Sequence, residues 1–161
     1  MQSSNILLTA FRDTSAELLI ANTTAFKTLI LPNDKIKDSE KLIDAILVEM
    51  PDYVISFGQR PNIKNKVHIE TTAQDDDFFI STNFDCDKLK LAFEQNGIVS
   101  KISNNAGTSF CNQLYLNGLK YILQNRLNMK MVFVHIPFEK HIIDFESFSK
   151  RILNAIADIS E

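Results

Sequence analysis

The sequence predicts an α/β fold, a three-layer α/β/α sandwich whose central sheet is mostly parallel. Short apolar runs rich in β-branched and aromatic residues alternate with longer stretches of helical period, a pattern typical of a parallel sheet covered by helices. Hydrophobic residues make up 45% of the 161 residues and include 12 Phe, which is enough to fill one core. No repeat, linker or low-complexity tract interrupts the pattern, so we expect a single domain over residues 1–161.

The first part of the chain carries strand and helix signals in alternation. An apolar helical stripe follows Thr14, whose hydroxyl is a suitable N-terminal cap. A second apolar stripe ends at Pro51, and we expect its cap to be Asp38 or Ser39. The expected strands of this part are residues 5–11, 26–31 and 53–57.

The second part continues the alternation. Residues 66–73 alternate apolar and polar side chains, which predicts a strand or hairpin arm with Glu70 on its polar face. The acidic residues 74–77 are expected to form a loop. The remaining expected elements are helices over 85–96, from about 108 and over 145–159, and strands over 98–103 and 129–134.

Charge and composition exclude several classes of protein. The chain has 17 Lys and Arg against 20 Asp and Glu, a formal charge of −3, and its basic residues are scattered. Nucleic acid and anionic lipid are therefore not expected as partners. The four glycines are too far apart for a dinucleotide-binding turn or a phosphate-binding loop, so no nucleotide cofactor is expected.

The two cysteines, Cys86 and Cys111, do not form a pair of the CxxC type. A disulfide scaffold and a thiolate zinc site are therefore not expected, and both thiols should be free. The first eleven residues lack the basic start and the long apolar stretch typical of a signal peptide or a membrane span. We expect a cytoplasmic location and no membrane partner.

A candidate reactive residue lies where a strand end runs through small residues into a helix, over residues 103–112. This segment places Cys111 in the first helical turn. Unpaired N–H groups and the helix dipole there favour a thiolate and can hold a developing oxyanion, as acyl transfer by cysteine requires. The alternative is that Cys111 is a small buried hydrophobic residue, as most free cysteines are.

A histidine, His135, ends a hydrophobic strand 24 residues after Cys111. Strand ends are where α/β folds build their sites. A nucleophilic cysteine needs a base whose second ring nitrogen is held by an acceptor, and Glu70 is a candidate acceptor because it lies on the polar face of its strand. The structural alternatives are a core histidine and a solvated glutamate.

Two segments closely resemble the motifs of one family. The string Ser103-x-x-Ala-Gly-Thr-x-x-Cys111-Asn and the later string Phe-Val-His135-Ile-Pro are similar to the nucleophile and histidine motifs of the pyroglutamyl peptidases, also called pyrrolidone-carboxylate peptidases. Residues 70–73 keep the spacing of the family's Glu-x-x-Ala motif. The resemblance implies a phosphorylase/hydrolase-like α/β/α fold in a cytosolic cysteine peptidase without metal or cofactor. It also implies a catalytic triad of Cys111, His135 and Glu70 that removes an N-terminal pyroglutamyl residue.

The resemblance extends to substrate-binding positions. Phe11 matches the aromatic residue after the family's first strand, and Gln59 matches the strand-end Gly-Gln whose loop borders the pyroglutamyl ring. The family's second phenylalanine after this position, and a later insertion that carries an oxyanion-binding arginine, have no counterpart in this chain. Oxyanion donors are therefore expected from the backbone N–H of Cys111 and from Arg60 or Arg12.

Hypotheses from two classes follow. The first is a cysteine peptidase or amidohydrolase that cleaves a pyroglutamyl or similar small acyl group from a small peptide or acyl-amide substrate. The second is a non-catalytic binding or regulatory domain that has kept the scaffold and lost the substrate pocket. The three triad residues together favour catalysis, although an acyl hydrolase of another specificity is also open. Family members often form tetramers, so a homo-oligomer is compatible with the resemblance.

Overall fold

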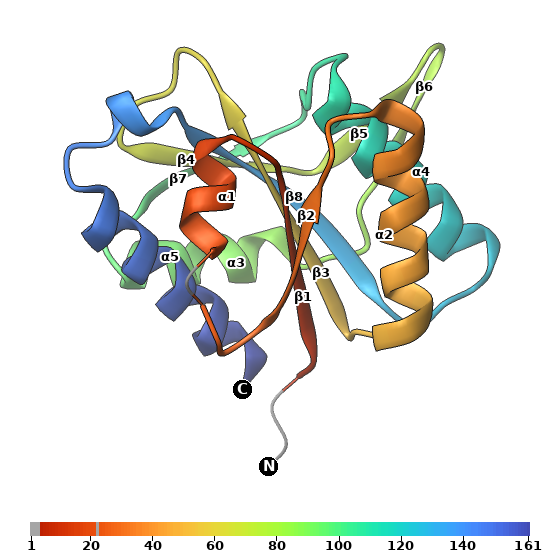
Figure 1. Ribbon diagram of the computed structural model, residues 1–161, viewed down its shortest axis with the longest axis horizontal. Helices are drawn as coiled ribbons and strands as arrows, with labels where there is room; N and C mark the ends of the chain where they lie inside the picture. The colour runs from red at the N-terminus through yellow and green to blue at the C-terminus, as the bar shows by residue number, and fades with distance from the viewer. Residues whose placement is uncertain (1–3, 22) are drawn as a thin grey trace.

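A six-stranded sheet with the strand order β2-β1-β3-β8-β4-β7 forms the centre of this computed structural model, which describes residues 4–21 and 23–161 (Figure 1). Residues 1–3 and 22 of the expected domain lie outside the described residues. The strands of the sheet are β1 (Ile6–Phe11), β2 (Lys27–Leu31), β3 (Tyr53–Arg60), β4 (Lys66–Glu70), β7 (Val99–Ser103) and β8 (Lys130–Pro137).

Helices cover both faces of this sheet, as Figure 1 shows. Helices α2 and α4 lie on one face, over an apolar cluster that includes Leu42 and Leu119. Helices α1, α3 and α5 lie on the other face, over a cluster that includes Phe93 and Ile156. The three-layer α/β expectation is therefore confirmed. The helices are α1 (Ser15–Ile20), α2 (Lys35–Glu49), α3 (Cys86–Gln95), α4 (Phe110–Gln124) and α5 (Phe145–Ser160), with a short 3₁₀ helix η1 (Glu139–His141).

The sheet is parallel except between β8 and β4. Across that antiparallel pair, Glu70 lies opposite Phe133 and His68 lies opposite His135. In the parallel pair of β3 and β8, Gly58 is the partner of His135. Because paired residues on neighbouring strands point to the same face, these five residues share one face of the sheet. It is the face that α2 and α4 cover, since Phe133 belongs to their cluster.

The start of α2 differs from the prediction. The helix begins at Lys35, and its cap is Asp34, whose side chain accepts two backbone N–H hydrogen bonds of the first turn. The expected caps Asp38 and Ser39 are instead buried inside the helix. Aspartate is a suitable cap at both positions, but only Asp34 has the extended backbone that a cap requires.

The loop expected over residues 74–77 is confirmed only at Asp76 and Asp77, which form a turn, and is wrong at Gln74 and Asp75, which lie in a strand. The chain forms an antiparallel hairpin there, with strands β5 (Thr72–Asp75) and β6 (Phe78–Ser81). The side chain of Asn112 holds this hairpin against α4, because it donates to the Gln74 carbonyl at 3.0 Å and accepts from the Gln74 N–H at 2.8 Å. This distant contact stabilises a strand that its acidic composition disfavours.

The other expected elements are confirmed with small shifts in their ends. Strands β3 and β8 continue past the expected ends, to Arg60 and Pro137. The strand expected over residues 66–73 divides at Thr71 into β4 and β5. Glu70 is therefore the last residue of a central strand.

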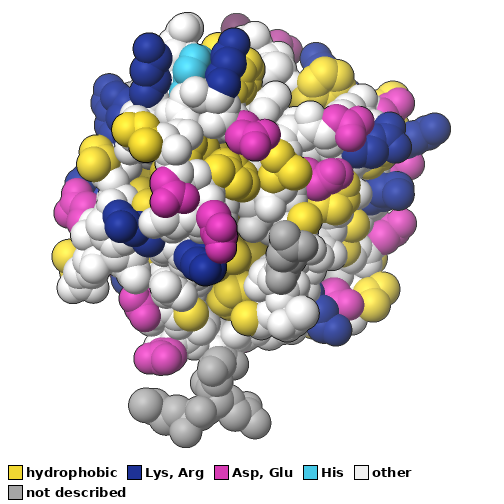
Figure 2. All heavy atoms as spheres, turned by 60° about the vertical axis from the view of Figure 1, so that its left-hand side comes forward, with side chains coloured by type: hydrophobic (Ala, Val, Ile, Leu, Met, Phe, Trp, Pro, Cys, Tyr) yellow, Lys and Arg dark blue, Asp and Glu magenta, His cyan; other side chains and the backbone are white. Residues whose placement is uncertain are grey.

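Charged side chains are spread over the surface. On the face that Figure 2 shows, Asp and Glu side chains lie among those of Lys and Arg, with apolar side chains between them. In the part of the chain that the structure describes, no helix combines the length and the apolar character needed to cross a membrane.

Candidate active site

Glu70 and His135 form a buried pair on neighbouring strands. Nδ1 of His135 lies 3.1 Å from Oε1 of Glu70, and the two residues are 3% and 0% exposed. The hydroxyl of Tyr115 donates to the backbone carbonyl of Glu70 at 2.7 Å, which ties the end of β4 to α4. A carboxylate on Nδ1 fixes the orientation of the imidazole ring and leaves Nε2 as the nitrogen for other contacts.

Arg60, at the end of β3, adds a positive charge to this pair. Its Nη1 lies 3.2 Å from the same Oε1 of Glu70. Its Nη2 is near Gly107, since a Cβ added to that glycine would lie 3.9 Å from it. A charged hydrogen bond of this kind stabilises the buried carboxylate as an anion. The guanidinium thus lies between the Glu70–His135 pair and the segment that leads into α4.

The thiol of Cys111 lies over Gly58. A Cβ added to Gly58 would be 2.6 Å from Sγ of Cys111 and 2.7 Å from Cζ of Phe133, so only glycine leaves room for the thiol. Because Gly58 is paired with His135, thiol and imidazole lie over neighbouring strands, which are about 4.8 Å apart. Among the described residues, the side-chain hydrogen bond of His135 goes to Glu70 and not to Cys111.

Burial makes Cys111 a weaker acid than its place at a helix start suggests. Burial raises the pKa of this thiol to about 12, and the charge of Glu70 acts in the same direction. The Ser109 hydroxyl and the charge of Arg60 lower the pKa but do not offset the loss of solvent. The favourable position at the helix start is thus outweighed by burial, and the prediction that this position favours the thiolate stays open to test. A reaction at Sγ needs a base that takes the proton of the thiol.

The predicted substrate-binding residues Phe11 and Gln59 lie on β1 and β3, but only Phe11 is on the same face of the sheet as Cys111, since the Gln59 side chain contacts the start of α1 on the other face. Phe11 is 4% exposed, and its ring lies 6.5 Å from the ring of Phe133, which lies 5.0 Å from the ring of His135. Oε1 of Gln59 accepts a hydrogen bond from the backbone N–H of Ser15 at 3.0 Å, at the start of α1. Both side chains thus have a packing or capping contact beside the site.

The two arginines considered as oxyanion donors lie in different places. Arg60 contacts Glu70, as described above. Arg12 instead donates from Nη2 to the Pro32 carbonyl at 3.4 Å, and its Nε lies 3.9 Å from Asp13. The structure therefore brings Arg60, and not Arg12, to the buried pair.

Two residues of the site, Phe133 and Asn112, stand in the motifs quoted above, but their residue types alone do not indicate their roles. Phe133 is one of many apolar residues, yet its ring is the floor between Phe11, Tyr115 and His135. Asn112 follows the cysteine and is a common turn residue, yet it clamps the β5–β6 hairpin. A glycine inside an apolar strand does indicate close approach of another group, and this applies to Gly58.

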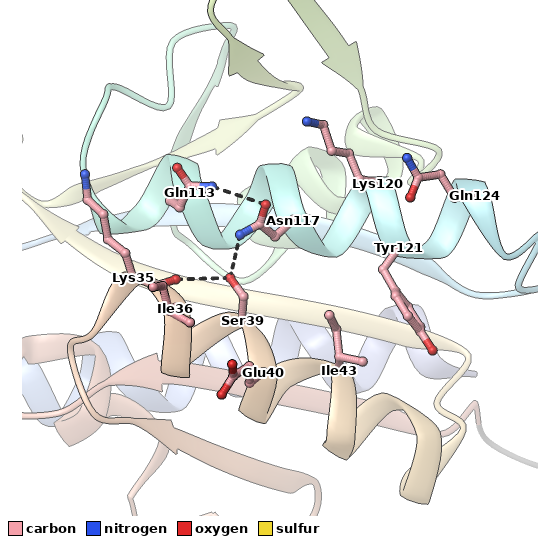
Figure 3. A pocket seen from close by; sticks show the side chains of 10 residues that line it. All are labelled: Lys35, Ile36, Ser39, Glu40, Ile43, Gln113, Asn117, Lys120, Tyr121 and Gln124. Carbon is pink, nitrogen blue, oxygen red and sulfur yellow. Dashed lines mark hydrogen bonds between the residues drawn. The ribbon is translucent and has the colours of Figure 1, made fainter.

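A separate hollow of about 570 Å³ lies between α2 and α4, as Figure 3 shows. At its base, Asn117 donates to the Ser39 hydroxyl at 2.8 Å and accepts from Gln113 at 3.2 Å. No predicted site residue lines this hollow. As for metals, no cluster of three His, Cys, Asp or Glu side chains able to hold an ion occurs within residues 4–21 and 23–161.

Comparison with known proteins finds similarity to one family. A family model described as pyroglutamyl peptidase matches residues 70–150, just over half of the chain, and this range includes Glu70, Cys111 and His135. The pyrrolidone-carboxylate peptidase of Brachyspira hyodysenteriae is 29% identical over 131 residues, which are 68% of this chain and 65% of that protein. That of Fusobacterium nucleatum is 30% identical over 135 residues, 70% of this chain and 62% of that protein. The chain thus spans less than two thirds of the length of these curated relatives.

Solved structures share the fold. The pyroglutamyl peptidase I of Bacillus amyloliquefaciens superimposes with a TM-score of 0.85 at 19% identity, over 99% of this chain and 95% of that one. The pyrrolidone carboxyl peptidase of Fervidobacterium islandicum superimposes with a TM-score of 0.84 at 17% identity, over 97% of this chain and 98% of that one. The family match spans the buried glutamate, the cysteine and the histidine on a scaffold of the same fold, and from this we conclude that the chain belongs to the pyroglutamyl peptidase family.

Proposed function

We propose that the protein is a cysteine peptidase that removes an N-terminal pyroglutamyl or similar small acyl group. The observation that supports this best is the buried contact of Glu70 with His135, which lies on the strand beside Gly58, the residue under the Cys111 thiol. A binding module does not need a buried carboxylate on an imidazole next to a thiol, because burying such groups is costly unless they are paired. Family membership supports the same reaction class.

In this proposal His135 is the base and Cys111 is the nucleophile. Nε2 of His135 takes the thiol proton as Sγ attacks the carbonyl carbon of the acyl group. The C–N bond then breaks, and the imidazolium returns its proton to the leaving amine, so that a thioester remains. Water, deprotonated by the same nitrogen, attacks the thioester and releases the acid and the free thiol. Glu70 holds the ring on Nδ1 and stabilises the imidazolium in both steps.

The start of α4 supplies the proposed oxyanion site. Ser109 is the cap residue of this helix, and its side chain makes no capping hydrogen bond within the described part of the chain. The first N–H groups of the helix, including that of Cys111, are therefore available to a developing oxyanion, which the helix dipole also favours. The charge of Arg60 acts in the same direction, since it already lowers the pKa of the Cys111 thiol.

The test is the release of a fluorescent amine from a pyroglutamyl amide by the purified, reduced protein. We expect wild-type turnover and a loss of at least about 10³-fold in kcat for Cys111→Ala. The matched control is Cys86→Ala, because Cys86 also begins a helix and is partly buried, but packs on the opposite face of the sheet. This control should keep wild-type turnover.

The outcomes separate the two classes of hypothesis. No turnover by a folded wild-type protein would reject the pyroglutamyl peptidase proposal and favour the binding domain. Equal turnover by wild type and Cys111→Ala would reject the thiol mechanism. Turnover of acetyl or formyl amides by the wild-type protein, without turnover of the pyroglutamyl amide, would instead indicate an acyl hydrolase of another specificity.

A further inference from the structure

A cavity of about 600 Å³ lies next to the proposed catalytic residues, on the β4 and β7 side of the sheet. We infer that this cavity binds the carboxylate end of the substrate's leaving peptide, so that short peptides with a free C-terminus are the preferred substrates. This inference rests on the proposed function and names the substrate class for the same site. The cavity residues used in the argument are Arg60, His68, Thr71, Lys101, Ser103 and Asn105.

The sheet places this cavity on the same level as the reacting groups. Lys101 on β7 is paired with His68 on β4, and His68 is paired with His135 on β8. His135 is paired in turn with Gly58 on β3, which lies below the Cys111 thiol, so the four residues form one row across the strands. Because paired residues point to one face, a ligand that crosses the strands from the thiol passes over His135 and His68 and then reaches Lys101.

The charge of the cavity suits an anion. Its ionisable lining residues are two cations, Arg60 and Lys101, and one imidazole, with no carboxylate among them. Arg60 is partly neutralised by Glu70, whereas Lys101 forms no salt bridge with any residue that the structure describes. Burial lowers the pKa of His68; the charge of Glu70 opposes this shift, and the charges of Lys66, Arg60 and Lys101 add to it. Lys101 therefore supplies the positive charge that a carboxylate would meet.

Hydrogen bonds between residues hold the rim of the cavity in place, and this rim carries both N–H and hydroxyl donors and oxygen acceptors. Thr71 donates to the Ser103 carbonyl from its backbone N–H at 2.8 Å and from its hydroxyl at 3.2 Å. The Ser103 hydroxyl accepts from the N–H of Asn105 at 3.2 Å. The end of β7 is therefore fixed against β4, and a ligand would meet a preformed edge.

The position of the cavity suits the leaving peptide of the substrate, and its distance from His135 suits a peptide of two residues. Phe11, matched to the acyl side by resemblance, lies on β1 in the same apolar cluster as Cys111, whereas His68 and Lys101 of the cavity lie on β4 and β7, beyond His135 on the opposite side. Two strand spacings separate Lys101 from His135, about 10 Å, which is the span of about three extended residues. A leaving peptide of two residues, together with the reach of a lysine side chain, covers that distance.

The experiment measures binding without turnover. Titration calorimetry on Cys111→Ala compares pyroglutamyl-Ala-Ala with the same peptide as its C-terminal amide, which differ only in the terminal charge. We expect the free acid to bind about fivefold or more tightly than the amide at low salt, and the difference to shrink as salt is raised. Adding Lys101→Met should reduce the preference to less than about twofold. The matched control is Lys27→Met, which removes an exposed lysine from β2, the opposite edge strand of the same sheet, and should leave the preference intact.

Each other result overturns the inference. It fails if the acid and the amide bind equally, if neither binds, or if the preference survives Lys101→Met. It also fails if Lys27→Met removes the preference to the same extent, because net charge would then explain the effect. The proposed function is tested separately by turnover of the neutral pyroglutamyl amide, so a protein that hydrolyses the amide but binds both peptides equally keeps its function and loses this carboxylate site.

Discussion

The two sides of the proposed active site differ in how their polar side chains are used. On the side formed by β4 and β8, Glu70 joins His135 and Arg60 in a network around a buried carboxylate. On the side formed by β1 and β3, Gln59 caps the start of α1 and Phe11 fills the core. In the proposed function the first side carries the chemistry, whereas Gln59 and Phe11 on the second side make structural contacts. If this division holds, reaction type and substrate choice depend on separate parts of the fold, and substitutions on each side should have different consequences.

The largest effect is expected for Glu70→Gln, which tests the chemical side. The amide keeps the shape of the side chain but presents the wrong group to Nδ1 of His135 and to Arg60. Turnover of the pyroglutamyl amide should fall by about 10³- to 10⁴-fold, as when the carboxylate behind a catalytic histidine becomes an amide. A loss of less than tenfold in a folded variant would mean that Glu70 has only a structural role. Circular dichroism and the melting temperature establish that the variant is folded.

The pH dependence of Cys111 alkylation should be the next largest effect. The pKa of this thiol is raised by burial to about 12, so the thiolate is the minor form throughout the neutral range. Because the minor form grows as pH rises towards the pKa, the iodoacetamide rate should increase about tenfold per pH unit between pH 7 and pH 9.5. The rate is followed by mass spectrometry on Cys86→Ala, which leaves one cysteine. A fast rate that does not change over this range would show that His135 already holds the proton in the resting protein.

Gly58→Ala should lower activity with a moderate cost in stability. The new Cβ would lie 2.6 Å from Sγ of Cys111 and 2.7 Å from the Phe133 ring, so the thiol and the ring must shift from their present positions. We expect a loss of about 10- to 100-fold in kcat, with about 1–3 kcal/mol of overpacking. Gly118→Ala is the control, because its Cβ would meet Met131 and Leu42 in the same apolar cluster. If Gly118→Ala lost as much kcat as Gly58→Ala, with both variants folded, the loss in Gly58→Ala would come from core packing and not from the position of the thiol.

The smallest effect is expected for Gln59→Ala, on the structural side. Loss of the acceptor for the Ser15 N–H should cost about 1 kcal/mol, or about 2–4 °C in melting temperature. Turnover should change by less than about threefold. An exposed glutamine at the end of α4, Gln124, provides a control substitution that should change neither quantity. A rise of tenfold or more in KM for Gln59→Ala would contradict the division between the two sides and make Gln59 a substrate-binding residue.

The sequence allows most of the fold to be predicted, because the signals for its elements are local. The strand over residues 5–11 and the helix capped by Thr14 depend on adjacent residues, and both are confirmed. The start of α2 was ambiguous because Asp34 and Asp38 are equally good caps by residue type. The β5–β6 hairpin could not be predicted, because the side chain that holds it, Asn112, lies 38 residues away.

The site was predictable in part for a similar reason. The motifs around Glu70, Cys111 and His135 identify the residues, and the structure brings the glutamate and the histidine into contact. The acidity of the thiol was not predictable from the helix start alone. It depends on burial against Gly58 and Phe133, which are distant in sequence, and burial has the larger effect on the pKa.

The place of β8 in the sheet has a consequence for how the chain is made. This strand is the last one in the described chain, yet it lies between β3 and β4, and it carries His135. During synthesis, β3 and β4 leave the ribosome with no neighbour to pair with on the sides that β8 will later occupy. Those edges are apolar and are the kind of surface on which nascent chains aggregate. The two parts of the sheet, β2-β1-β3 and β4-β7, are therefore joined only once β8 is made, and a nascent chain that stops before residue 130 lacks both this link and the proposed base.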